Sequence, residues 1–306
     1  MFKKIVVIFL FLPGLVFAQY DRPGSSDAQF LKIGVSARAA GMGDAYIAVV
    51  EGAEAAFYNP AALARVNGLD VAFNHTNWFA GINHDFVAVA NTFRHIGTFG
   101  ISVTALYTDE MKVRTPLRPD GTGETFYATN IRFGISYARY LTDRVSFGGS
   151  INYINMSLYS DISADAVSAD IAILYVTNFR GFRFGMQIAN FGSEIKFVNE
   201  SYPLPTNFTF GIAMNAIQGQ DQKVLVSFSA VKPNDGQPLG HLGVEWGYRN
   251  LLFARTGYRL NHDIATYSFG GGMRMNISTY QFKFDYSYSD FALLGVAHRL
   301  GIGLSF

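Results

Sequence analysis

Residues 280–289 read YQFKFDYSYS, a run in which every second side chain is aromatic. Gln, Lys, Asp and Ser fill the positions between the aromatic ones. Successive side chains of a β-strand face opposite sides of the sheet, so this run predicts a strand with one aromatic face and one polar face. The same alternation occurs in residues 241–249, 265–277 and 294–306, with His298 as the exception in the last segment. The C-terminal third therefore predicts an all-β fold.

The charges of these segments lie on the face that carries small residues. A soluble β-sandwich would also alternate, but its outward face would carry more charge. A transmembrane barrel has the observed pattern, because lipid surrounds the apolar face and the polar face lines the lumen. We therefore expect the following side chains to point into the lumen: Arg132, Glu245, Arg255, Arg259, Arg274, Lys283, Asp285 and Arg299.

These inward charges have two interpretations. They form an anion-selective or substrate-guiding interior, or they are paired Arg and carboxylate groups that brace a plug inside the barrel. We favour the second interpretation, because an unpaired buried charge is costly.

Composition agrees with an outer-membrane barrel. The 306 residues include 24 basic and 23 acidic side chains, and only 15% are charged, against roughly 25% in an ordinary soluble protein. The near-zero net charge argues against a nucleic-acid partner, whose binding domain would carry a basic stripe. With no cysteine, the chain cannot use thiol catalysis, an iron–sulfur cluster or disulfides.

The N-terminus has the pattern of an export signal. Lys3 and Lys4 precede an apolar run at 5–17, and Val16-Phe17-Ala18 has the small-x-small pattern of a cleavage site before Gln19. The run is shorter than the ~20 residues of a membrane-spanning helix, and we expect no later spanning helix. We predict a signal peptide over 1–18 and a multi-pass protein of a Gram-negative outer membrane. Its partners are then the lipid and the assembly machinery of that membrane, with Phe306 as the terminal insertion signal.

The alternation divides the chain into fourteen strands, an even number as bacterial barrels require. Connections after even-numbered strands are tight, and several after odd-numbered strands are long, which predicts short periplasmic turns and long external loops. The expected strands are 69–79, 83–94, 96–107, 126–140, 143–158, 161–178, 181–192, 205–217, 220–232, 237–249, 250–261, 264–277, 278–288 and 293–306.

The segment before the first strand is different. Residues 25–67 are rich in Ala and Gly and show little alternation, which favours short helices. Pro60 suits the first position of a short helix, with Asn59 as its N-cap. Gly41-x-Gly43 is no dinucleotide site, because no strand precedes it. We therefore divide the mature chain into an N-terminal hatch over 19–67 and a barrel over 68–306.

Two runs in this segment carry a family resemblance: FLKIGVSARAAGMGDA at 30–45 and AAFYNPAAL at 55–63. The succession resembles the PorV/PorQ family, which is itself similar to the FadL-type outer-membrane transporters. This resemblance implies a fourteen-stranded barrel with an N-terminal plug, and the Asn-Pro-Ala turn is the element shared with the FadL-type hatch. The residues it marks as the hatch motif and a possible ligand path are Gly41, Gly43, Phe57, Tyr58, Asn59, Pro60 and Ala61.

The resemblance implies two functions. A PorV-like member is an accessory component of type IX secretion that binds exported proteins and passes them to surface attachment, and this is the reading we favour. A FadL-like member is a passive transporter that moves hydrophobic small molecules across the outer membrane. A general polar porin is disfavoured, because the hatch is expected to plug the lumen.

Catalysis has little support in the sequence. None of the six histidines has a metal-binding spacing such as HExxH. The neighbours His84 and Asp85 are only a weak signal for a hydrolase site. We expect no enzymatic activity, no catalytic residue, no metal and no cofactor.

Overall fold

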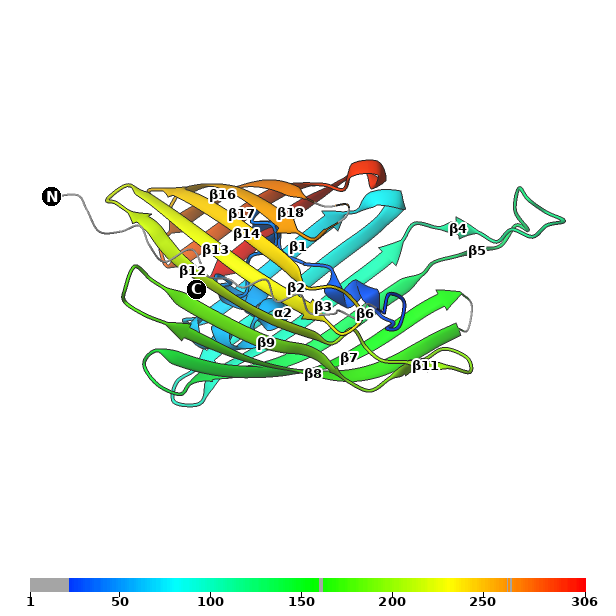
Figure 1. The fold of residues 1–306 in the computed structure, drawn as a ribbon, viewed down its shortest axis with the longest axis horizontal. Coiled ribbons are helices and arrows are strands. Elements are labelled where there is room, and N and C mark those ends of the chain that lie inside the picture. Colours follow the sequence, from blue (N-terminus) through cyan, green and yellow to red (C-terminus); the bar gives the residue numbers. More distant parts are fainter. Residues whose placement is uncertain (1–21, 160–161, 263, 265) are drawn as a thin grey trace, which may run out of the picture.

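The computed structural model describes residues 22–159, 162–262, 264 and 266–306. The predicted signal peptide therefore lies outside the described residues. Fourteen strands form one closed antiparallel barrel (Figure 1), which confirms the predicted fold class. They are β1 (Leu69–Asn77), β2 (Ile82–Phe93), β3 (Gly97–Thr108), β6 (Thr129–Tyr140), β7 (Val145–Tyr159), β8 (Ile162–Val176), β9 (Arg183–Gly192), β12 (Asn207–Gln218), β13 (Gln222–Pro233), β14 (Leu239–Tyr248), β15 (Leu252–Leu260), β16 (Tyr267–Ile277), β17 (Tyr280–Asp290) and β18 (Val296–Ser305).

The first and last strands close the barrel. Phe73 of β1 lies opposite Val87 of β2 on one side and Ile302 of β18 on the other. Beyond β18, the backbone N–H of Phe306 donates to the carbonyl oxygen of Leu69 at 2.8 Å. Closure removes the free sheet edge, so the backbone groups of the wall are satisfied between strands, as lipid requires.

The two faces of the wall differ as the alternation predicts. On β3, Ile101 is 52% exposed on the outer face, whereas the neighbouring Ser102 is 3% exposed on the inner face. Ile135 and Ile302 are likewise about half exposed, at 52% and 51%. The outer surface is therefore apolar and the inner surface is small or polar.

Two of the long connections hold strands that the sequence analysis did not predict. The β3–β6 connection contains β4 (Met111–Lys112) and β5 (Thr125–Phe126), which pair as a hairpin that projects beyond the barrel (Figure 1). The β9–β12 connection contains the paired strands β10 (Ile195–Lys196) and β11 (Ser201–Tyr202). The sequence analysis predicted long connections here but not these hairpins, because strands of two residues are too short to show alternation.

Short helices occupy the lumen between the N-terminal end and β1. They are η1 (Gln29–Lys32), α1 (Ala37–Gly41), η2 (Gly52–Glu54), α2 (Ala55–Tyr58) and η3 (Pro60–Arg65), while η4 (Phe79–Gly81) and η5 (Ala292–Leu294) lie in loops. Residues 26–66 of the predicted hatch contain the first five of these helices. This segment starts near the long loops, where the N–H of Asp27 donates to the carbonyl of Pro203 at 3.1 Å, and ends where β1 begins. No helix in the described part of the chain is long and apolar enough to cross a bilayer.

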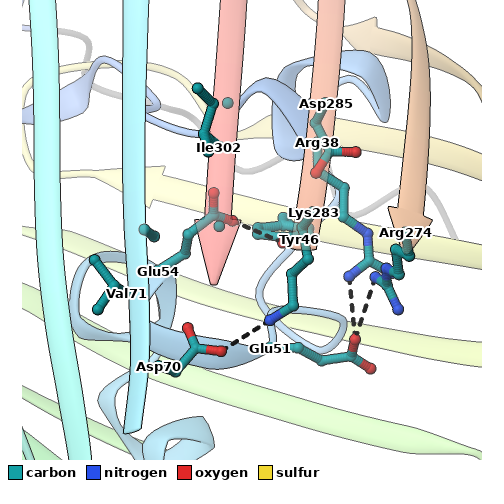
Figure 2. A pocket seen from close by; sticks show the side chains of 13 residues that line it. Arg38, Tyr46, Glu51, Glu54, Asp70, Val71, Arg274, Lys283, Asp285 and Ile302 are labelled. Atoms are coloured by element: carbon teal, nitrogen blue, oxygen red, sulfur yellow. Dashed lines mark hydrogen bonds and ion pairs between the residues drawn. The ribbon is translucent and has the colours of Figure 1, made fainter. Parts of the chain in front are cut away.

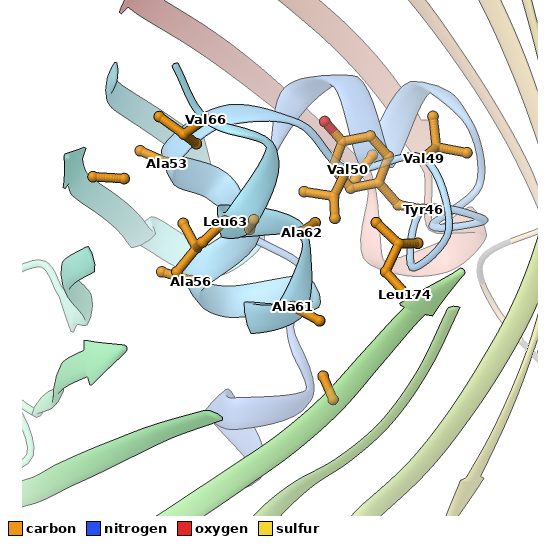
Figure 3. Close-up of a cluster of buried hydrophobic side chains, with 14 of the residues drawn as sticks. Tyr46, Val49, Val50, Ala53, Ala56, Ala61, Ala62, Leu63, Val66 and Leu174 are labelled. Atoms are coloured by element: carbon orange, nitrogen blue, oxygen red, sulfur yellow. The ribbon is translucent and has the colours of Figure 1, made fainter. Parts of the chain in front are cut away.

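The hatch has its own apolar core and packs directly on the wall. Tyr46 and Leu63 of the hatch and Leu174 of β8 belong to one buried cluster (Figure 3). Wall glycines allow the close approach: a Cβ on Gly148 of β7 would lie 2.5 Å from the backbone nitrogen of Ala61. The small residues of the inner face therefore provide the space that the hatch fills.

Candidate functional site

The Asn-Pro-Ala turn joins two parts of the hatch. Asn59 is fully buried, and its Oδ1 accepts a hydrogen bond from the N–H of Ala61 at 3.1 Å, which caps η3. Its Nδ2 donates to the carbonyl of Ile47 at 2.9 Å. Pro60 is the first residue of η3, so the predicted cap and helix start are confirmed. One side chain thus fixes both the start of η3 and the segment that precedes η2.

A buried cluster of ion pairs connects α1 to the wall. Arg38 of α1 donates from Nε and Nη2 to the two carboxylate oxygens of Glu245 on β14, both at 2.8 Å. Arg255 of β15 donates from Nε to the same carboxylate at 2.6 Å and from Nη1 to Asp285 of β17 at 2.6 Å. A carboxylate held by two guanidinium groups has most of its lone pairs satisfied, and such charge-assisted bonds are the strong ones. This cluster fixes α1 against three strands.

Another carboxylate, Glu51 of the hatch, faces several cations. Glu51 lies 3.2 Å from Arg38 and 3.5 Å from Arg274 (Figure 2). It also lies 3.4 Å from Arg183 of β9. Burial opposes the charge of Glu51, but Arg38 and the two wall arginines outweigh it and hold its pKa well below the ordinary value. In the same region Lys283 pairs with Asp70 at 2.8 Å. A cavity of about 30 Å³ remains among these residues, which leaves room for one or two water molecules.

Other ion pairs lie nearer the long loops. Arg132 of β6 donates to Asp170 of β8 at 2.7 Å, and Ser150 and Asn152 donate to the same carboxylate. On the hatch, Asp44 accepts from Arg259 of β15 at 2.6 Å. Burial disfavours the ionised form of Asp44, but the charges of the nearby arginines lower its pKa to about 2.

A cavity of about 330 Å³ lies above the hatch on the side of the long loops. The hatch lines it with Phe57 and Tyr58, whose ring centroids are 5.0 Å apart. The loops contribute Trp78 and Phe291, whose ring centroids are 4.8 Å apart. These four aromatic rings share the lining with charged and polar side chains, and their surface suits an apolar group.

The structure groups the predicted site residues into two sets. Of the eight expected inward charges, five are buried and three are half-buried. The set around α1 and Glu51 is Glu245, Arg255, Arg274, Lys283 and Asp285, and the set around the larger cavity is Arg132, Arg259 and Arg299. Gly41 and Gly43 contact the wall near β15 and β16. The functional roles of all these predicted site residues are proposals.

Sequence reasoning missed the partners of these charges. It did not select Arg38, Asp44 and Glu51 of the hatch, nor Asp70 and Asp170 of the wall. A usable signal was present, because charged residues are rare in the Ala- and Gly-rich hatch and each must find a partner when the segment is buried.

Comparison with known protein families shows which family the chain belongs to. The family model described as "Type IX secretion system protein PorV" matches residues 18–234, which include the hatch and the barrel as far as β13. The chain belongs to the PorV family. A search of curated proteins gives no match.

Solved structures similar to this PorV-family chain include two toluene transporters and a FadL homologue. The toluene transporter TodX of Pseudomonas putida has 12% sequence identity and a TM-score of 0.61, with 89% of this chain and 97% of TodX covered. The toluene transporter TbuX of Ralstonia pickettii has 13% identity, the same coverages and a TM-score of 0.58. A FadL homologue of Pseudomonas aeruginosa has 11% identity, coverages of 89% and 98%, and a TM-score of 0.55. At these identities the likeness shows the fold, which with the family supports an outer-membrane location.

Proposed function

We propose that this protein is a non-enzymatic accessory component of protein secretion or surface attachment, and that it binds exported proteins at its external rim. Membership of the PorV family carries the proposal. The buried hatch supports it, because helices held by ion pairs on several strands leave a barrel suited to binding rather than to free diffusion. Export by the predicted signal peptide over 1–18 and periplasmic placement of the short turns are parts of the same proposal.

The β4–β5 hairpin is the part of the rim that we expect to contact the partner. It projects beyond the other connections (Figure 1), and Leu117 near its tip is 94% exposed. The segment 109–124 also carries both positive and negative side chains. An exposed apolar residue among charges is a common composition for a polar-rimmed contact surface.

The test is purification from the native outer membrane in a mild detergent, followed by mass spectrometry of the bound proteins. The intact chain is expected to retain exported proteins or secretion-system components. Replacing residues 111–126 with a short Gly-Ser linker should remove them while the barrel still assembles. A matched control is Arg249→Gln at a short turn of the opposite end, where Arg249 is 62% exposed. If the intact chain retains no such protein, the proposed function is wrong; if the shortened variant retains them all, the hairpin is not the contact.

The larger cavity favours a second candidate function, passive transport of a hydrophobic small molecule. Its aromatic lining and volume of about 330 Å³ suit such a ligand, and two of the similar structures are described as toluene transporters. Uptake of radiolabelled toluene by cells with and without the gene tests this candidate. Equal uptake would exclude toluene, and a deficit restored by the intact gene would support transport.

A further inference from the structure

The lumen also contains a cavity at the end of the barrel that carries the short turns. It has a volume of about 30 Å³, and it is lined by Arg38 of α1, Arg183 of β9, Lys223 of β13 and Arg274 of β16. Asn250, an exposed residue of the short turn between β14 and β15, lines it as well. The cavity therefore reaches the end of the barrel, and we call it the turn-end cavity.

Three arginines around the turn-end cavity share one carboxylate, that of Glu51. Its oxygens lie 3.2 Å from Arg38, 3.4 Å from Arg183 and 3.5 Å from Arg274, and Figure 2 shows the first and the last of these contacts. All three distances exceed the roughly 2.7–2.9 Å of a strong charge-assisted bond. Arg183 is 7% exposed, and its buried Nε has no acceptor among the described residues. Glu51 therefore satisfies these guanidinium groups only in part.

Lys223 adds a further cation to the cavity. The residue is half-buried, and none of the ion pairs within the described chain includes it. Glu51 and Glu245 attract its ammonium group from beyond ion-pair distance, whereas Arg38 and Arg183 repel it. An ammonium group has three N–H donors, so Lys223 has donors for an additional acceptor.

The charges of this region do not cancel. Glu245 is held by Arg38 and Arg255, and Arg255 also pairs with Asp285. Together with the three other cations of the cavity and with Glu51, this makes five cations and three carboxylates in the described chain. Two positive charges therefore have no negative counterpart.

Neighbouring charges preserve this surplus. Lys283 pairs with Asp70 at 2.8 Å, and Arg65 and Glu54 of the hatch carry opposite charges. Each of these additions is neutral in sum. The short-turn end of the lumen thus holds an excess of positive charge, and partly buried charges of one sign are costly unless an anion compensates them.

The donors and the size of the turn-end cavity restrict the ligand. Carboxylates match guanidinium and ammonium donors in charge and in hydrogen bonding. A volume of about 30 Å³ is space for about two water molecules, and therefore for the two oxygens of one carboxylate. The rest of the ligand then lies outside, along the short turns, where Arg180 is exposed before β9. A flexible chain with spaced carboxylates meets these conditions, whereas a compact organic acid does not.

We propose that the short-turn end of the barrel binds an acidic polypeptide segment, and that one of its carboxylate side chains enters the turn-end cavity between Arg183, Lys223 and Arg274. The surplus of two positive charges favours a segment with at least two acidic residues. In the orientation of the proposed function this end faces the periplasm, so the partner differs from the one at the external rim. The two sites lie at opposite ends of the barrel, so binding at either can fail without the other.

The experiment measures the binding of two matched peptides by calorimetry. The glutamate peptide is Gly-Glu-Gly-Glu-Gly with both ends blocked, and the glutamine peptide has Gln in place of each Glu. The full mature chain is used in a non-ionic detergent at low ionic strength, where charges are screened least. We expect the glutamate peptide to bind saturably. The loss of charge-assisted bonds predicts roughly 10- to 100-fold weaker binding of the glutamine peptide.

Lys223→Gln is the decisive variant and should weaken binding of the glutamate peptide by roughly 10-fold. Because Lys223 forms no ion pair in the described chain, the barrel should stay folded, which the faster gel migration of unboiled protein checks. Lys223→Arg keeps the charge and should retain binding. The matched control is Arg94→Gln, which removes an exposed charge from the short β2–β3 turn on the opposite side of the barrel, and it should bind like the parent.

A competition arm separates a polypeptide from small free anions. Acetate or inorganic phosphate, added at the same molar concentration as the glutamate peptide, should not displace it. If either anion displaces the peptide, the cavity is a site for small anions and the proposal is wrong. The proposal is also overturned if the glutamate peptide does not bind, if the glutamine peptide binds as well, if Lys223→Gln binds like the parent, or if Arg94→Gln weakens binding as much as Lys223→Gln.

Discussion

Replacing Glu245 with Gln should loosen the hatch without opening the barrel. Glu245 accepts two hydrogen bonds from Arg38 and one from Arg255 in a buried site. Removing one partner of a buried ion pair typically costs about 3–5 kcal/mol. Arg38 keeps Glu51 at 3.2 Å, and Arg255 keeps Asp285 at 2.6 Å, so we expect the lower end, about 3 kcal/mol.

Hydrogen–deuterium exchange measures this loss where it occurs. A loss of about 3 kcal/mol in the free energy of local opening corresponds to roughly 100-fold faster exchange. We expect that acceleration for the amides of residues 37–66 in Glu245→Gln, and little change in the strands. The control is Arg249→Gln, because the exposed pair of Arg249 and Asp221 contributes almost nothing. Unchanged exchange of the hatch would refute the idea that these ion pairs hold it, and equal acceleration in the strands would show that Glu245 supports the wall instead.

Four other outcomes are expected. Unboiled protein in detergent should migrate faster on a gel than boiled protein; identical migration would contradict a closed barrel. Asn59→Ala removes the cap on the N–H of Ala61 and should destabilise the hatch by about 0.5–2 kcal/mol. Hydrogen–deuterium exchange of the hatch amides should then be faster, while the amount of protein in the outer membrane stays normal. Deleting Phe306 should lower the amount inserted into the outer membrane, and normal levels would remove its signalling role. Because the pKa of Asp44 is lowered to about 2, its pair with Arg259 should stabilise the hatch fully above about pH 4 and lose this effect as the pH falls towards 2.

The strands were predictable because their signal is local. The barrel strands are nine to fifteen residues long, and alternation within them predicted their number and order from the sequence alone. The predicted strand bounds were wrong where strands pair with each other in the loops beyond the barrel. The predicted strand 126–140 includes Phe126, which belongs to β5, while β6 begins at Thr129. Alternation marks extended backbone but does not say which neighbour the backbone pairs with.

The site was predictable only in part, because its partners are far apart in the sequence. Alternation placed Glu245 and Arg255 on the inner face, since that depends on their own strands. The partner Arg38 lies 207 positions from Glu245, and the hatch has no periodicity that orients its side chains. The charged residues of an otherwise small and apolar segment could be recognised as needing partners, but their pairing required the packed structure.

Glycine and charge together explain how the hatch sits in the barrel. A Cβ on Gly185 of β9 would lie 2.8 Å from the carbonyl oxygen of Ile47, and one on Gly243 of β14 would lie 2.6 Å from that of Met42. The hatch backbone therefore lies against the wall where no side chain intervenes, and such close packing excludes the water that would otherwise solvate charges. Ion pairs replace that water around α1, where the arginines reach carboxylates. Above the hatch the packing ends in a cavity, where Asp44 of the hatch pairs with Arg259 of the wall. Close packing and ion pairs therefore depend on each other: wall glycines bring the hatch backbone against the wall, and the buried charges at that contact are paired across it.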